Sequence, residues 1–236
     1  MIGFLGGMFG KGGSAVATPL LAAVGVPAII AVAAPLPATI PSTLAASSVY
    51  WKARLIDWRI VRWSLGFGIP ATVAGAIATR WVGGPFLVKV TDCVLVVLGL
   101  RFLLVRHQPA TVPAKPPRTQ SWLLAEIAIG VGLISGLLAN AGGFLLAPLY
   151  VAVLRLPIKA AFASSLAVAA VLAVPGTVVH AILGHIDWAL VAVFAVTSVP
   201  LSFVGGRVAL RTDPARLERL YGAAISVLGI TFLIVK

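Results

Sequence analysis

Acidic residues, histidine and cysteine are all scarce in this chain. Its 236 residues include 6 Asp and Glu, 3 His and 1 Cys. A single cysteine, Cys93, excludes internal disulfides and thiolate metal clusters. His180 and His185 are five residues apart, a poor spacing for one helical face, and no carboxylate cluster accompanies them. The sequence therefore predicts no metal site and no cofactor.

Catalytic motifs are missing as well. The chain contains no Ser-His-Asp order, no His-Glu-x-x-His sequence and no nucleotide-binding glycine loop. We therefore predict a protein that is not an enzyme and has no catalytic residues.

Apolar residues are abundant instead. They make up 60% of the chain, charged residues make up 10%, and the mean hydropathy is +1.08. One soluble core cannot hide so much apolar surface, so the solvent is predicted to be a lipid bilayer. The net charge is +12, but Lys and Arg gather at the ends of apolar stretches, where headgroups lie, rather than along one face. This pattern argues against nucleic acid as a partner and favours a multi-pass protein of the plasma membrane.

The apolar stretches predict an all-α polytopic membrane protein with about 7 to 10 helical segments. They run over 1–10, 13–32, 35–51, 58–82, 85–105, 121–141, 143–156, 160–183, 188–210 and 217–235. Prolines and charges at 106–120 interrupt them and predict a linker. We therefore expect a first transmembrane repeat at 1–105, a cytoplasmic linker at 106–120 and a second transmembrane repeat at 121–236.

The two halves resemble each other at an offset of 130 residues. The tripeptide Ile-Asp-Trp occurs at 56–58 and again at 186–188, and Pro27, Pro70 and Gly75 have counterparts at 157, 200 and 205. Lys and Arg crowd the 51–62 junction but are absent from its counterpart, and the next junction reverses this bias. By the positive-inside rule, equivalent junctions then face opposite sides of the membrane. We expect two inverted-topology repeats, with both chain termini outside and the linker in the cytoplasm.

The repeated Asp-Trp pairs have a structural interpretation. Asp57 and Asp187 each precede a helical run and are followed by Trp. This order is typical of a helix N-cap beside an aromatic anchor at the membrane interface. We therefore expect both aspartates to cap helices rather than to bind a ligand.

Each half opens with an apolar piece, a glycine break and a second short apolar piece. The breaks read GKGG at 10–13 and NAGG at 140–143. Non-helical backbone survives at membrane depth only where protein or a water-filled cavity receives its polar groups. We therefore expect a broken or re-entrant helix in each half, whose second piece directs free N–H groups toward the break. The alternative is that these glycines only allow close helix packing.

At these residues the sequence resembles a known family. GGMFGKGGSAVATPLL and SGLLANAGGFLLAPLY are similar to the glycine-rich openings of the TauE/SafE sulfite exporters, also called TSUP permeases. ARLIDW, GHIDW and FASSLAV resemble further elements of that family, and the resemblance covers nearly the whole chain. It implies an exporter or permease of small sulfur-containing anions, such as sulfite, sulfoacetate or a related organosulfonate.

The candidate binding residues are those that could offer backbone N–H groups, a positive charge or a hydroxyl to an anion. They are Gly10, Lys11, Gly12, Gly13, Ser14, Asn140, Gly142, Gly143, Ser164 and Ser165. Two alternatives stay open for the polar ones: Lys11 could snorkel to the surface, and the serines could bond to helix carbonyls.

We expect transport by alternating access at the interface between the repeats. Two other functions stay open, namely a non-transporting scaffold subunit and a permease for a metal or another cation. The expected partners are a small anion and the lipid bilayer, and a homo-oligomer is compatible with the sequence.

Overall fold

The computed structural model describes residues 2–10, 14–90, 93, 97 and 120–234, and every regular element in these ranges is helical. The all-α prediction is therefore confirmed. The elements are α1 (Ile2–Met8), α2 (Ser14–Ala23), α3 (Ala28–Ala33), α4 (Pro35–Lys52), α5 (Trp58–Ala78), the 3₁₀ turn η1 (Thr79–Trp81), α7 (Gln120–Leu137), α8 (Gly143–Ala152), α9 (Ile158–Ile182), α10 (Trp188–Arg211) and α11 (Pro214–Ile234). Residues 84–90 are helical too.

Four helical segments of the described residues are long and apolar enough to cross a membrane. They are Ala28–Lys52, Trp58–Trp81, Ile158–Ile182 and Trp188–Arg211. Each segment has 24 or 25 residues. At a rise of about 1.5 Å per residue, a helix of this length is longer than the hydrocarbon core of a bilayer is thick. Two shorter apolar helices, Trp122–Leu137 and Gly143–Ala152, lie between them in the sequence. The chain is a multi-pass membrane protein.

Two of the long helices begin at an aspartate that caps them. One carboxylate oxygen of Asp57 accepts hydrogen bonds from the N–H groups of Arg59 and Ile60, and Asp187 does the same at the start of α10. These bonds satisfy amides that have no partner within the helix. Trp58 and Trp188 follow directly and are 52% and 60% exposed, which suits the membrane–water interface. The predicted N-cap role of both aspartates is confirmed.

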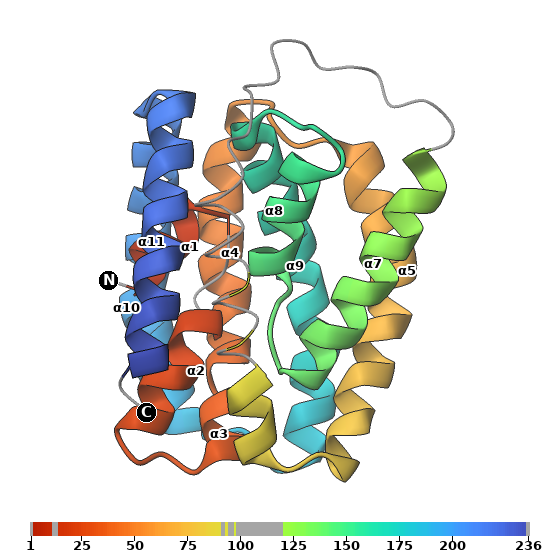
Figure 1. The fold of residues 1–236 in the computed structure, drawn as a ribbon, viewed down its shortest axis with the longest axis vertical. Coiled ribbons are helices and arrows are strands. Elements are labelled where there is room, and N and C mark those ends of the chain that lie inside the picture. Colours follow the sequence, from red (N-terminus) through yellow and green to blue (C-terminus); the bar gives the residue numbers. More distant parts are fainter. Residues whose placement is uncertain (1, 11–13, 91–92, 94–96, 98–119, 235–236) are drawn as a thin grey trace.

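The helices associate through glycines that let two backbones touch. A Cβ atom at Gly136 of α7 would collide with the backbone oxygen of Thr72 in α5. A Cβ atom at Gly7 of α1 would collide with the oxygen of Ser202 in α10 in the same way. In Figure 1, α7 lies along α5 at one side of the bundle, and α4 and α9 lie between this pair and α10. Small residues thus set the distances between helices, as is common in membranes.

These contacts recur at equivalent positions of the two halves. Thr72 and Ser202 are separated by the same 130 residues as the Asp-Trp pairs, whereas Gly7 and Gly136 are separated by 129. The carbonyl oxygen of Gly7 accepts a hydrogen bond from the Tyr50 hydroxyl at 3.3 Å. At the position 130 residues further on, His180 places its Nε2 atom 3.3 Å from the carbonyl oxygen of Gly136. The first helix of each half therefore packs against the other half.

Basic residues gather at one end of the bundle, which we call the arginine end. The α4–α5, α8–α9 and α10–α11 junctions meet there and lie at the top of Figure 1. Its basic residues are Lys52, Arg54, Arg59, Arg155, Lys159, Arg211 and Arg216. The described junctions of the opposite end are 24–27, 79–83 and 183–187, and they contain one basic residue of the Lys or Arg type, Arg80. The predicted charge bias between equivalent junctions is thus also a bias between the two ends.

Part of the predicted organisation falls outside the described residues. This applies to Lys11, Gly12 and Gly13 of the first break and to the predicted linker, of which only Gln120 is described. Ser14 is the first residue of α2.

We predict that Gly136→Ala destabilises the protein and Gly130→Ala does not. The new methyl group at 136 would meet the backbone of α5, an overpacking that costs about 1–3 kcal/mol or more. Gly130 lies on the same helix, and a Cβ atom there would have nothing within 4 Å. Alanine at 130 should therefore raise the free energy of unfolding by about 1 kcal/mol, because alanine has a higher helix propensity than glycine. Thermal unfolding of the two purified variants in detergent measures the difference. Equal unfolding temperatures would contradict the backbone contact.

Candidate functional site

The break at 138–142, whose residues are all described, joins α7 to α8. After Leu137, the backbone enters the left-handed region at Ala139 (φ 44°) and again at Gly142 (φ 75°). The N–H group of Asn140 donates to the carbonyl oxygen of Ser135 at 2.7 Å, which closes the turn. The break is buried, because Asn140 is 2% exposed and Ala141 is fully buried. Glycine at 142 avoids the clash that a side chain causes in this conformation.

The break reverses the direction of the chain. Gly132 and Gly136 of α7 approach Gly68 and Thr72 of α5, so these two helices run in parallel, away from the arginine end. The chain leaving α8 reaches the arginine end, where Leu156 and Pro157 line a pocket with residues 54–58. The α7–α8 unit is therefore a helical hairpin that turns inside the protein. The α1–α2 pair is built similarly, since α1 runs parallel to α10 and α2 ends at the opposite end. The expected break is confirmed for the second half, whereas residues 11–13 of the first break lie outside the described residues.

Helix α8 starts inside the bundle without a side-chain cap. Its N-cap residue is Gly142, whose carbonyl oxygen accepts hydrogen bonds from the N–H groups of Leu145 and Leu146, both at 3.0 Å. Among the described residues, no acceptor faces the N–H groups of Gly143 and Phe144. Two amides and the positive end of the helix dipole are thus available at the turn.

Ser135 brings a hydroxyl group to this helix start. Its side chain is fully buried, and its Oγ atom has no hydrogen-bond partner in the described structure. A Cβ atom built on Gly142 would lie 2.7 Å from that Oγ atom and 3.2 Å from the Val131 side chain. The Ser135 hydroxyl therefore points at Gly142, the N-cap residue of α8. A buried polar group without a partner costs free energy, so its retention suggests a ligand.

The surroundings of this turn are apolar. Leu138, Ala139 and Ala141 pack into a cluster of buried hydrophobic residues with Val32, Ala33 and Leu36 of the other half. Because water is scarce there, hydrogen bonds from the amides and the hydroxyl to a negatively charged ligand would be strong.

The first break differs from the second in what it contacts. Gly10 has φ 69°, and its carbonyl oxygen accepts a hydrogen bond from the Ser165 hydroxyl of α9 at 2.9 Å. The same hydroxyl lies 3.0 Å from the carbonyl oxygen of Phe162, one turn earlier. The Ser165 hydroxyl thus bonds to two backbone carbonyls. This is the alternative to ligand binding that the sequence analysis gave for the serines.

Ser164 is directed elsewhere. Its Oγ atom accepts a hydrogen bond from the backbone N–H of Asp57 at 3.0 Å, so it ties α9 to the α4–α5 junction. The structure therefore brings together Asn140, Gly142 and Gly143, and separately Gly10 and Ser165. Of the remaining candidates, Lys11, Gly12 and Gly13 lie outside the described residues and Ser14 begins α2, and the role of all four stays a prediction.

Ser135 itself was missed by sequence reasoning. It opens the glycine-rich motif SGLLANAGG, but nothing in the motif indicates which way its hydroxyl points. The available signal was its place, because Ser135 lies one turn and a half before the break in an otherwise apolar stretch.

A histidine pair lies near the opposite end. The Nδ1 atoms of His180 and His185 are 3.2 Å apart, and His180 is fully buried. Burial lowers the pKa of His185, which favours its neutral ring. Within the described residues no group of three or more His, Cys, Asp or Glu side chains could hold a metal ion.

Comparison with known proteins identifies the family of this chain. The family model described as "Sulfite exporter TauE/SafE" matches residues 1–232. The chain belongs to the TauE/SafE family. It is 24% identical over 244 residues to the "Probable membrane transporter protein YjnA" of Bacillus subtilis (strain 168), covering 98% of this chain and 96% of that protein. It is 25% identical over 245 residues to a "Probable membrane transporter protein" of Xylella fastidiosa (strain 9a5c), covering 98% and 90%. No solved structure matches the chain.

Membership of the TauE/SafE family makes this protein a membrane permease and not an enzyme. A permease of this family acts from within the bilayer, which agrees with the four spanning segments. At the buried turn before α8 of this transporter, the unpartnered Ser135 hydroxyl lies beside an uncapped helix start.

We predict that Tyr150→Phe loosens the hairpin. The Tyr150 hydroxyl lies 2.6 Å from the Ser64 hydroxyl, and this buried bond fastens α8 to α5. Phenylalanine leaves Ser64 without that partner, which should cost about 1–3 kcal/mol of stability. Thermal unfolding in detergent measures this loss. The double variant Tyr150→Phe with Ser64→Ala should recover part of it, and additive losses in the two variants would show that the bond contributes nothing.

Proposed function

We propose that this TauE/SafE protein moves small sulfur-containing oxyanions, such as sulfite or sulfoacetate, through the membrane. The observation that carries this proposal is the unpartnered, fully buried Ser135 hydroxyl at the uncapped start of α8. A helix start that offers free amides beside a hydroxyl attracts negative charge and repels cations.

An oxyanion suits these donors because it presents several oxygen atoms on one small group. The N–H groups of Gly143 and Phe144 and the hydroxyl of Ser135 could each donate to a different oxygen. Such hydrogen bonds need no buried lysine or arginine, so the empty site leaves no full charge uncompensated in the protein interior. The family name, sulfite exporter, agrees with this class of ligand.

We propose further that the two halves form inverted repeats and expose the site alternately to each side. The recurring contacts of Gly7 with Ser202 and of Gly136 with Thr72 support this relation. The first helix of each half packs on the other half: α1 lies on α10, and α7 lies on α5. A rocking motion of one half relative to the other would therefore move both of these helix pairs. The arginine end would face the cytoplasm under the positive-inside rule. An inside-negative potential then favours anion exit by about 2.3 kcal/mol per charge per 100 mV.

We predict that Ser135→Ala weakens anion binding by about tenfold or more and leaves the protein folded. A hydrogen bond to a charged group contributes about 1.5–3 kcal/mol, and that contribution would be lost. Ser198→Ala is the matched control, because the Ser198 hydroxyl is also buried without a partner, but the residue lies on α10 against Gly3 of α1 and not at the turn. Sulfite-dependent thermal stabilisation and sulfite flux into liposomes measure the effect. Equal behaviour of the two alanine variants would overturn the role of Ser135.

The class of substrate has its own test. Proteoliposomes containing the purified protein should transport sulfite or sulfoacetate and discriminate against chloride, which presents one spherical acceptor atom instead of several oxygen atoms to the donors. Sulfate and thiosulfate complete the panel. Flux of chloride at the rate of sulfite, or flux of a metal cation instead, would contradict an oxyanion site.

A further inference from the structure

Two histidines are in contact where α9 ends, at the end of the bundle opposite to the arginine end. His180 is the fully buried member of this pair, on the last turn of α9, and His185 is the partly exposed member, on the 183–187 junction. Their Nδ1 atoms are 3.2 Å apart, and their ring centroids are 5.4 Å apart. The two rings therefore form a direct path from this end of the bundle into its interior.

The contacts of His180 fix where the hydrogens of both rings lie. Its Nε2 atom is 3.3 Å from the carbonyl oxygen of Gly136, and a carbonyl oxygen can only accept, so this nitrogen carries a hydrogen. The Nδ1 atom of a neutral His180 ring is then an acceptor, and the Nδ1–H group of His185 donates to it. The Nε2 atom of His185 keeps a lone pair and has no hydrogen-bond partner among the described residues. A proton can therefore be added to the pair at His185.

The pair can hold one added proton but not two. When the Nε2 atom of His185 takes a proton, the hydrogen bond between the two Nδ1 atoms is kept. The hydrogen of that bond can then move to His180, which becomes the charged ring while His185 becomes neutral again. A second proton would place two N–H groups against each other across 3.2 Å. Protonation can thus bring a single positive charge to the contact with Gly136.

His180 is joined through α7 to the turn that begins α8. Gly136, whose carbonyl oxygen it contacts, directly follows Ser135, whose hydroxyl lies beside the start of α8. Earlier turns of α9 reach this turn as well, because Ala169 and Ala173 belong to the buried apolar cluster that contains it. In such surroundings a positive charge is weakly screened, so it would act on an anion held at the turn.

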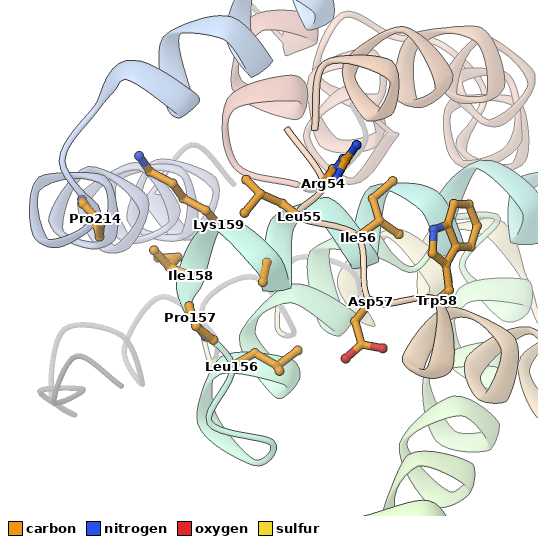
Figure 2. Close-up of a pocket in the computed structure, with 11 residues that line it drawn as sticks. Arg54, Leu55, Ile56, Asp57, Trp58, Leu156, Pro157, Ile158, Lys159 and Pro214 are labelled. Carbon is orange, nitrogen blue, oxygen red and sulfur yellow. The ribbon is translucent and has the colours of Figure 1, made fainter. Parts of the chain in front are cut away.

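Few other charged groups surround the pair. Asp187 has the one carboxylate at this end among the described residues, and it accepts from the N–H groups of Ala189 and Leu190. Arg80 and Lys89 are exposed. The ionisable groups of the other helices that pack around α9 lie toward the arginine end: Lys52 of α4, Arg59 and Arg62 of α5, Glu126 of α7, and Arg54, Asp57 and Lys159 around the pocket in Figure 2. A positive charge on the pair therefore has no free counter-ion in the described part of the chain.

The first half makes the equivalent contact with residues that do not titrate near neutral pH. The counterpart of His180 is Tyr50, whose hydroxyl donates to the carbonyl oxygen of Gly7, and the counterpart of His185 is Leu55. A tyrosine hydroxyl stays neutral at physiological pH. Helix packing therefore requires a hydrogen-bond donor at this position, but it does not require a histidine.

We propose that protonation of the His180–His185 pair strengthens anion binding at the α7–α8 turn, so that the transporter binds its anion more tightly at lower pH. This inference rests on the anion site proposed above. The charge on the pair would attract the anion, and the anion would be the counter-ion that the pair lacks. The effect is reciprocal, so a bound anion favours proton uptake by the pair. Burial lowers the pKa of His185, which keeps this ring neutral in the free protein at neutral pH.

The test uses methanesulfonate, a sulfonate whose charge does not change between about pH 5 and 8, the range in which histidine titrates. Titration calorimetry of the purified protein in detergent measures its affinity across this range. Calorimetry in two buffers of different ionisation enthalpy measures the protons taken up on binding.

The decisive variant carries His180→Gln together with His185→Asn, because glutamine keeps an N–H donor for the Gly136 carbonyl and neither amide takes a proton. His185→Asn alone is the second variant, and it keeps a donor for the Nδ1 atom of His180. His107 is the third histidine of the chain and lies outside the described residues, so His107→Asn is the control for the loss of a histidine.

We expect the parent and His107→Asn to bind methanesulfonate at least about fivefold more tightly at pH 5 than at pH 8 and to take up protons on binding. The double variant should bind at both pH values as the parent does at pH 8, without proton uptake. His185→Asn alone should show a smaller change with pH than the parent.

Two results would overturn the role of the pair and leave the anion site in place. One is an affinity of the parent that does not change with pH, and the other is a full pH dependence in the double variant or in His185→Asn. Absence of methanesulfonate binding by the parent at every pH would instead overturn the anion site, and the inference with it.

Discussion

Backbone amides and carbonyls inside a bilayer must find their partners within the protein, and the rest of this structure depends on that constraint. Long helices meet it automatically, but the turn between α7 and α8 cannot. There the Ser135 carbonyl accepts a hydrogen bond from the Asn140 amide, and the Gly142 carbonyl accepts hydrogen bonds from two amides of α8. The amides of Gly143 and Phe144 have no acceptor among the described residues. The same constraint that makes non-helical backbone rare in membranes therefore leaves unpaired amides where such backbone does occur.

Close packing by glycine makes such a buried turn possible. Because Gly132 and Gly136 let α7 touch α5, the hairpin enters the protein rather than lipid, and its turn meets the apolar cluster around Val32 and Leu36. The Tyr150–Ser64 bond then fixes α8 on the same helix. Side chains larger than hydrogen at the α5–α7 contact would separate the helices and expose the turn to acyl chains. The packing role of glycine and its role at the turn are thus two parts of one arrangement.

Sequence reasoning predicted the features that depend on local pattern. The spanning segments follow from hydropathy, the caps at Asp57 and Asp187 from residue type, and the breaks from adjacent glycines. Contacts across the fold were not accessible in this way. Ser164 accepts from an amide 107 residues away, and Ser165 binds a carbonyl 155 residues away. The direction of the Ser135 hydroxyl likewise depends on how α7 and α8 pack together, which no local pattern encodes.

Comparison of the two halves distinguishes residues that the helix packing requires from residues that suit the environment at one end of the bundle. Tyr50 and His180 differ in chemistry, yet each reaches the backbone carbonyl of a packing glycine, so this contact belongs to the architecture. Arg54 and Gly184 share a left-handed turn, but only one carries charge. Arg54 has a backbone conformation that glycine adopts more easily, and glycine is the residue at the equivalent position 184. The arginine is therefore explained by the environment at that end of the bundle and not by the turn. The likeness between the two halves thus supplies the reference against which each exception can be interpreted.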